Sequence, residues 1–304
     1  MITQLVAEQG LNGLQLGVTL FLMAAGLTLV FGIMDVIHLS HGSFYMVGAY
    51  LTATFGARFD SYLVGLALAI PAAALIGMAV EWIAIRKLYQ RDHLDQVLAT
   101  FGLIMFFNEG VRMIWGAQPI FLSPPQMLSG TVELLPGLAY PQFRLAILVT
   151  GLAVAAGLAL LIQRTRLGMR LRAGASDRAM AGALGVDIDK LFTIVFGLGA
   201  GLAALAGGMA GTVLSVQVGM GESILILAFV VVVIGGIGSV KGALVGALLV
   251  GLVDTLARTV LPVALRGAFG NAVADGIGAS LASSSVYVLM VLVLAWRPKG
   301  LYGA

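Results

Sequence analysis

The sequence contains no cysteine and carries very little charge. Without cysteine the chain has no disulfides, no thiolate metal sites and no cysteine nucleophile. Only 10% of its 304 residues are Asp, Glu, Lys or Arg, whereas soluble domains contain about 25%, so the charge cannot cover a globular surface in water. The chain is 60% hydrophobic and includes 41 glycines, a composition typical of helices that pack closely in lipid. These features predict a polytopic membrane protein and exclude a soluble enzyme.

The apolar stretches predict a single all-α membrane domain over 1–304, a bundle of about eight to nine transmembrane elements, some of them broken or re-entrant. A spanning helix needs about 20 mostly apolar residues. The stretches that meet this length are 9–34, 36–57, 61–80, 96–116, 145–163, 191–221 and 276–296. The Gly-rich region 223–262 is expected to supply one or two more elements, and its part 222–241 either crosses fully or enters and returns.

The basic residues predict which ends of these spans face the cytoplasm. They gather in the connections 81–95 and 164–190 and in the C-terminal tail, and cytoplasmic loops carry an excess of Lys and Arg. The C-terminus is therefore expected inside and the N-terminus outside. The connection 117–143, which is rich in proline, is expected outside as a rigid, irregular loop. We assign the net charge of +3 to this orientation signal and not to nucleic-acid binding.

The connection 164–190 is far more polar than its surroundings. A short helix is predicted near 177–184, with Ser176 as its N-cap and Asp177 in its first turn, where the helix dipole favours an acid. Gly185 is predicted to end this helix. A weakly apolar helix with small side chains could enter a cleft in another protein, or it could rest on the lipid surface.

The chain lacks the motifs that bind nucleotides. A P-loop requires Gly-Lys followed by Ser or Thr, and no Gly-Lys dipeptide occurs in the sequence. The Gly-rich runs 197–211 and 235–242 have no strand–turn–helix setting, and their glycines are better explained by close helix packing. We therefore expect no enzymatic activity and no cofactor. Any ATP hydrolysis linked to this chain is therefore expected on another chain.

Polar residues interrupt the apolar sequence at 35–43. Ionisable groups at membrane depth usually face a cavity or a partner, so a helix break that lines a pathway is one interpretation. The other places this segment at the cytoplasmic interface, in water. A metal site is not expected, because no HExxH motif or further ligand accompanies the two histidines. The segment 240–247 has a similar pattern to 40–49, which favours an internal repeat of broken elements. Within helices, Glu109 with Arg112 and Asp254 with Arg258 are expected to form ion pairs.

The chain resembles the permease subunits of ABC importers, and most closely the H-type permease of branched-chain amino acid importers. The resemblance covers nearly the whole chain. It is carried by Thr165 to Gly168, Arg170 to Ala173, Asp177, Ala181, Leu184 and Gly185, by Asp35 to Phe44, by Gly235 to Gly242, and by Arg297 to Gly303.

This resemblance implies two groups of functional residues. The residues expected to couple the permease to an ATPase are Thr165, Arg166, Leu167, Gly168, Arg170, Arg172, Asp177, Ala181, Ala183, Leu184 and Gly185. Those expected along the translocation pathway are Asp35, His38, Ser40, His41, Gly42, Ser43, Gly236, Gly238 and Ser239.

The resemblance also implies a complex in a bacterial cytoplasmic membrane. The expected partners are a second related permease, two cytoplasmic ATPase subunits, an external solute-binding protein and membrane lipid. The permease pair is expected as a heterodimer, with a homodimer as the alternative. Transport by alternating access of branched-chain amino acids is expected, with urea, amides or aromatic acids as alternative solutes. An ion-coupled secondary transporter is the alternative of another class.

Overall fold

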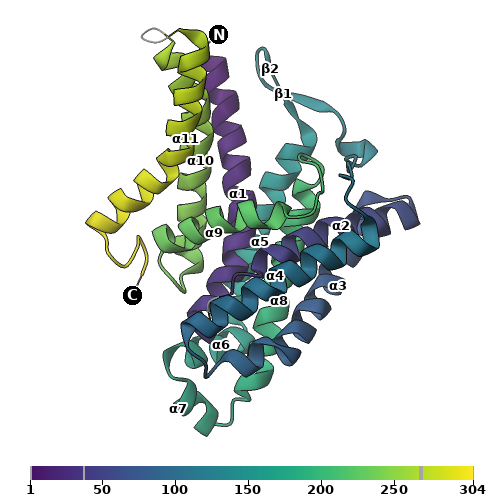
Figure 1. Cartoon of the computed structure of the whole chain (residues 1–304), viewed down its shortest axis with the longest axis vertical. Helices are drawn as coiled ribbons and strands as arrows, with labels where there is room; N and C mark the ends of the chain where they lie inside the picture. Colours follow the sequence, from purple (N-terminus) through teal and green to yellow (C-terminus); the bar gives the residue numbers. More distant parts are fainter. Residues whose placement is uncertain (1, 37, 267–269, 304) are drawn as a thin grey trace.

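The computed structural model describes residues 2–36, 38–266 and 270–303, and this part of the chain is almost entirely helical (Figure 1). The α-helices are α1 (Ile2–Met34), α2 (His41–Phe59), α3 (Tyr62–Ile83), α4 (His93–Trp115), α5 (Gln142–Arg164), α6 (Arg166–Ser176), α7 (Arg178–Ala183), α8 (Ile188–Ala210), α9 (Met220–Gly235), α10 (Val240–Leu265) and α11 (Asn271–Trp296). The shorter elements are the 3-10 helices η1 (Ile85–Leu88) and η2 (Gln126–Leu128) and the strands β1 (Thr131–Leu135) and β2 (Leu138–Pro141).

Seven of the described helices are long and apolar enough to cross a membrane, namely α1, α3, α4, α5, α8, α10 and α11. The apolar helices α2 and α9 join this bundle, and α9 has only 16 residues. The fold is thus the all-α polytopic membrane bundle that the sequence predicts.

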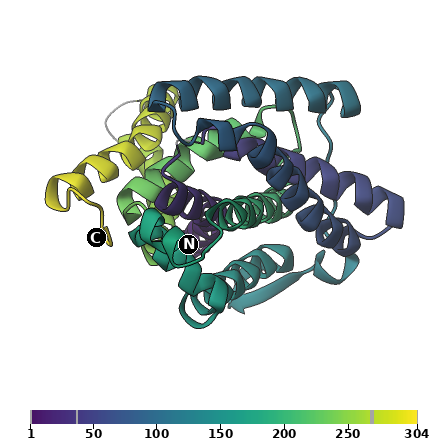
Figure 2. The ribbon, with the colours of Figure 1, turned by 90° about the horizontal axis from the view of Figure 1, so that it is seen from below.

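Two central helices, α1 and α8, form the core of the bundle. Most residues of each are buried inside the chain, whereas only about a quarter or fewer of those in α4, α5, α10 and α11 are. Small residues allow this crowding, because Gly26 of α1 lies directly against Gly199 of α8. Seen from below, the other helices surround this central pair (Figure 2).

The helices around this pair are arranged as an inverted repeat. Gly17 of α1 lies against Ala247 of α10, and Gly77 of α3 lies against Ala200 of α8. Likewise α9 packs on α1 and α2 packs on α8. The set α8–α9–α10 therefore repeats the set α1–α2–α3 with the opposite direction through the membrane. In this repeat α2 corresponds to α9. The predicted repeat instead matched 40–49, the start of α2, with 240–247, which is the start of α10, so its pairing of segments is wrong.

Each half of the repeat contains a break. After α1, Asp35 adopts a left-handed conformation (φ 53°), and α2 starts only at His41. After α8, the segment 211–219 turns back, and Val216 forms a β-bridge with Ile120 before α9 starts at Met220. The starts of α2 and α9 meet, since Gly42 lies directly against Gly221.

These breaks correct two predicted spans. The helix predicted at 36–57 begins five residues later, because the left-handed Asp35 ends α1 and the chain must turn before α2. The helix predicted at 191–221 ends at Ala210, because the bridge at Val216 requires extended backbone. The region 222–241 therefore holds most of α9, the turn that follows it and the first residues of α10.

The two ends of the bundle carry different connections. The N-terminal turns of α1 contact the β1–β2 hairpin, where Gln4 Nε2 donates to the carbonyl of Pro136 at 3.2 Å and Tyr140 donates to Asn12 at 3.2 Å. The connection 117–143 is thus an ordered antiparallel hairpin in part, and not an irregular loop. Helices α6 and α7 lie at the opposite end (Figure 1).

Candidate coupling and pathway sites

A tight turn joins α5 to α6. Thr165 ends α5 and caps α6, because its Oγ1 accepts a hydrogen bond from the backbone N–H of Gly168 at 3.0 Å. Gly168 lies against the carbonyls of Leu161 and Ile162, so closely that no side chain would fit there. Thr165 and Gly168 therefore fix the angle at which α6 folds back against the end of α5.

The short helix α7 is capped at both ends. The Oδ1 of Asp177 accepts from the backbone N–H of Met180 at 2.9 Å, and Gly185, with φ 88°, follows the last turn. The stop at Gly185 is confirmed. The predicted N-cap is wrong: Ser176 is the last residue of α6, and Asp177 is the cap, because a carboxylate next to extended backbone reaches the free N–H groups.

Helices α6 and α7 expose both apolar and basic side chains. Exposed side chains include Met169, Met180 (58% exposed), Ala183 and Leu184 (79% exposed). The basic residues among them are Arg166, Arg170, Arg172 and Arg178, all exposed. We call the face formed by Met169, Met180, Ala183 and Leu184 the α6–α7 face.

Three of the residues expected to couple the chain to an ATPase are turned inward. Ala181 is 3% exposed, Gly168 is buried and Leu167 is half-buried. The sequence pattern did not single out Met169, which lies between the expected Gly168 and Arg170. The one feature of the sequence that could have pointed to Met169 is that it is an apolar residue within a basic stretch.

A buried carboxylate anchors this end of the chain. Glu81, near the end of α3, is fully buried and accepts from Arg86 at 3.2 Å, from Tyr89 at 2.5 Å and from Thr193 of α8 at 2.7 Å. Burial and the hydrogen bond to this carboxylate raise the pKa of Tyr89, and the same carboxylate raises the pKa of Arg86. No sequence pattern singles out Glu81, yet this residue ties the connection after α3 to the start of α8.

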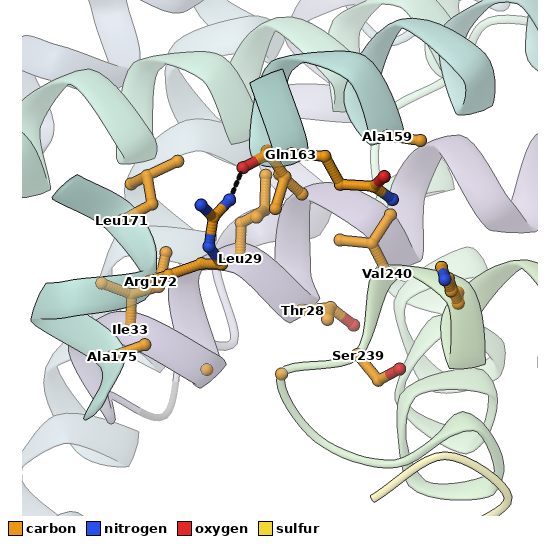
Figure 3. Close-up of a pocket in the computed structure, with 14 residues that line it drawn as sticks. Thr28, Leu29, Ile33, Ala159, Gln163, Leu171, Arg172, Ala175, Ser239 and Val240 are labelled. Atoms are coloured by element: carbon orange, nitrogen blue, oxygen red, sulfur yellow. Dashed lines mark hydrogen bonds between the residues drawn. The ribbon is translucent and has the colours of Figure 1, made fainter. Parts of the chain in front are cut away.

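A cavity of about 290 Å³ opens where α1, α5, α6 and α10 meet (Figure 3). Arg172 of α6 enters it and donates to the carbonyl of Ile162. Thr28 of α1 also borders it, as do Gly238 and Ser239 from the turn before α10. The cavity thus brings the expected coupling residue Arg172 together with two expected pathway residues.

The C-terminal tail holds the turn before α10. Leu301 donates its backbone N–H to Ile234 at 2.8 Å, and Tyr302 donates to Gly235 at 2.9 Å. Gly236, at φ 99°, lies against the backbone of Gly303. The expected pathway residue Gly236 is therefore covered by the tail and borders none of the cavities described here.

The segment 35–43 is mostly inside the core. Asp35 is exposed, whereas His38, Ser40 and His41 are buried, with His38 Nδ1 3.3 Å from Ser40 Oγ and the His38 ring 4.7 Å from that of Phe196. The interpretation that these three residues are in water at an interface is therefore wrong. Gly42 and Ser43 border a small cavity at the start of α9.

Both predicted ion pairs within helices are confirmed. Arg112 lies 3.5 Å from Glu109 on the exposed side of α4. Arg258 donates two hydrogen bonds to the buried carboxylate of Asp254, at 2.8 and 2.9 Å.

The geometry defines a class of protein: a polytopic membrane protein with broken helices at its centre and an ordered helical platform at one end. Residues 10–295 match the model of the family described as "Branched-chain amino acid transport system / permease component", and the chain belongs to this family.

Curated relatives extend over nearly the whole chain. It is 32% identical to the high-affinity branched-chain amino acid transport system permease protein BraD of Pseudomonas aeruginosa, over 97% of this chain and 95% of that protein. It is 29% identical to LivH of Salmonella typhimurium over the same shares, and 27% identical to a probable LivH of Methanocaldococcus jannaschii, over 93% and 88%. No solved structure matches the chain.

Proposed function

We propose that this chain carries branched-chain amino acids across a bacterial cytoplasmic membrane as a permease subunit of an ATP-driven importer. The observation that carries this proposal is the α6–α7 face. It is built on a helical platform at one end of a membrane bundle, and its apolar side chains stay exposed among the residues that the structure describes. Exposed apolar patches of this kind mark interaction sites.

In this proposal the α6–α7 end is cytoplasmic, the N-terminus is outside and the C-terminus is inside. The arginines of α6 and α7 lie at this end, as the excess of basic residues in cytoplasmic connections requires. An ATPase subunit docks on the α6–α7 face, with Ala183 and Leu184 at the contact and Arg166 and Arg170 at its border. The N-terminal end with the β1–β2 hairpin then faces the external binding protein.

The coupling route in this proposal passes through α6. Thr165 and Gly168 fix α6 to α5, and Arg172 extends from α6 into the cavity that Ser239 borders. A displacement of α6 by the ATPase therefore reaches the turn before α10. Because α9 ends at this turn and begins at the break beside Gly42, the motion reaches the centre of the bundle.

The expected pathway residues lie around the first break and at the turn between α9 and α10. Asp35, His38, Ser40, His41, Gly42 and Ser43 belong to the first break and the start of α2, while Gly236, Gly238 and Ser239 follow α9. We propose that they shape the path by letting α2 and α9 move, and that a second related permease completes the path. A heterodimer is the arrangement we propose.

A substitution on the α6–α7 face tests this proposal. Ala183→Arg combined with Leu184→Arg places two long cations where an apolar partner surface must approach, and burying poorly paired charge there costs several kcal/mol. Since each 1.4 kcal/mol is tenfold in affinity, we expect copurification of the ATPase and uptake of leucine to fall at least 100-fold at normal membrane levels.

The matched control is Met127→Arg, an equally exposed position (77%) on the hairpin side of the chain. It should leave copurification of the ATPase unchanged. Wild-type uptake by the Ala183→Arg, Leu184→Arg variant would show that the α6–α7 face only rests on lipid. Uptake that is driven by an ion gradient and needs no ATP would show that the chain is a secondary transporter and not part of an ATP-driven importer.

A further inference from the structure

One carboxylate lies at half depth on the exposed side of the bundle. Glu222 is in the first turn of α9, next to Gly221, which packs on Gly42 of α2. The neighbouring His41 lies against Gly26 and Gly199. Because Gly199 is near the middle of the membrane-crossing helix α8, the start of α9 and Glu222 are near the middle of the membrane.

No cation of the described chain pairs with Glu222. The ion pairs found among the described residues do not include it. Its hydrogen-bond partner is Asn108 of α4, whose Nδ2 donates to Oε1 at 2.6 Å. The positive end of the α9 dipole offsets part of the charge. An exposed carboxylate at this depth is nevertheless costly unless water or a cation reaches it.

A very small cavity adjoins this carboxylate. It measures about 10 Å³ and is bordered by Ser43 of α2, Asn108 of α4 and Glu222 of α9, among apolar side chains. A space of about this size accommodates one water molecule, and an ammonium group is of similar size. The cavity is too small for a whole amino acid, so only the head group of such a solute would fit.

We propose that Glu222 faces the aqueous solute path and binds the ammonium group of the transported amino acid, with Asn108 holding the carboxylate in position. This assignment rests on the proposed function, because it takes an amino acid as the solute. It assigns a role in solute selection to a side chain outside the two expected groups of residues. A solute without a cationic group would gain nothing from this carboxylate.

Thiol labelling tests whether Glu222 faces water, and it needs no knowledge of the solute. The chain has no cysteine, so Ile226→Cys, one turn from Glu222 and at a position 52% exposed, introduces a unique thiol into this subunit of the whole transporter. We expect cationic trimethylammonium-ethyl and anionic sulfonato-ethyl methanethiosulfonates to label it. Adding Glu222→Gln should lower the cationic-to-anionic rate ratio about tenfold, as unit charges about 6 Å apart in water predict.

The control is Leu152→Cys, which is 54% exposed near the middle of α5. It should not react with either reagent. If Ile226→Cys is equally unreactive, or if its rate ratio does not change with Glu222→Gln, Glu222 does not face the path and the proposal is overturned.

Uptake tests the ammonium contact itself. Glu222→Gln keeps the shape of the side chain. At leucine concentrations below KM, it should lower the rate of uptake at least tenfold, and the ATPase should still copurify. Glu222→Asp should retain more uptake than Glu222→Gln. Glu109→Gln, which removes an exposed carboxylate of α4, is the matched control. Normal uptake by Glu222→Gln overturns the assignment. If the wild-type transporter imports no branched-chain amino acid, the proposed function is contradicted instead. The labelling result would still show whether Glu222 faces the aqueous path.

Discussion

Close contacts between small residues determine how tightly the central helices pack. Gly48 of α2 lies against Ala204 of α8, and Gly207 of α8 lies against the backbone of Tyr45. At such points a side chain would have to displace backbone atoms of the neighbouring helix. Helix association in lipid depends on this packing. Lipid tails are as apolar as the helix surfaces, so the hydrophobic effect does not drive one helix against another.

Gly48→Val is expected to destabilise the fold by about 1–3 kcal/mol or more, since it overpacks a contact between two helix backbones. The midpoint of thermal unfolding, measured by size-exclusion chromatography of heated detergent-solubilised protein, should fall by several degrees. Gly110→Val is the control, because nothing lies within 4 Å of the position of its Cβ. Equal midpoints for the two variants would contradict this packing.

Individual residues could be predicted from the sequence where a local rule applies. Spacing along a helix was enough to predict Asp254 with Arg258, and the left-handed preference of glycine was enough to predict the stop at Gly185. Glu81 and Glu222 could not be predicted in this way. Their partners Thr193 and Asn108 are more than 100 positions away in the sequence, so only the fold brings them together.

At the scale of elements, the apolar runs predicted the long helices, and the polar residues at 35–43 indicated a helix break there, which the structure has. The runs alone showed neither break. A window of hydropathy does not distinguish a continuous helix from an extended segment followed by a shorter helix, and both 36–57 and 191–221 are of this second kind. The hairpin in 117–143 was missed because proline-rich sequence gives no alternating pattern of strand length. Similarly, the burial of Ala181 follows from how α7 packs on the rest of the chain, which periodicity alone does not give.

The hairpin connection is expected to form part of the platform for the binding protein. Phe121 and Met127 are 80% and 77% exposed, whereas Leu122 lies against Gly211 and has a structural role. Phe121→Ser with Met127→Ser should therefore raise the KM for uptake several-fold at limiting binding protein and leave expression unchanged. Leu122→Ser should instead reduce expression. If the double variant shows wild-type uptake at limiting binding protein, this connection is not part of the platform.

At the scale of the whole molecule, the inverted repeat places the starts of two short helices against each other in the middle of the bundle. Since α2 and α9 each follow a break, neither helix is continuous with α1 or α8. The sequence pattern favoured an internal repeat, but it paired 40–49 with 240–247, which begins α10. The correct pairing could not be read from the sequence, because the two halves share an arrangement of helices and not a series of residues.

The orientation of the whole molecule has a direct test. Gln4→Cys, at the exposed start of α1, should react with a membrane-impermeant maleimide added to intact cells. Leu184→Cys, on the α6–α7 face, should react only after the cells are opened. The reverse pattern would place the α6–α7 face outside, where no ATPase could reach it.

The most direct test of the central claim is solute uptake by the transporter reconstituted in liposomes, with this chain, its sister permease and the ATPase subunits in the membrane. We predict that leucine accumulates only when the ATPase is supplied with ATP and the binding protein is on the opposite side, and that Ala183→Arg with Leu184→Arg abolishes accumulation. Leucine accumulation without ATP, or undiminished accumulation by that variant, would contradict the account.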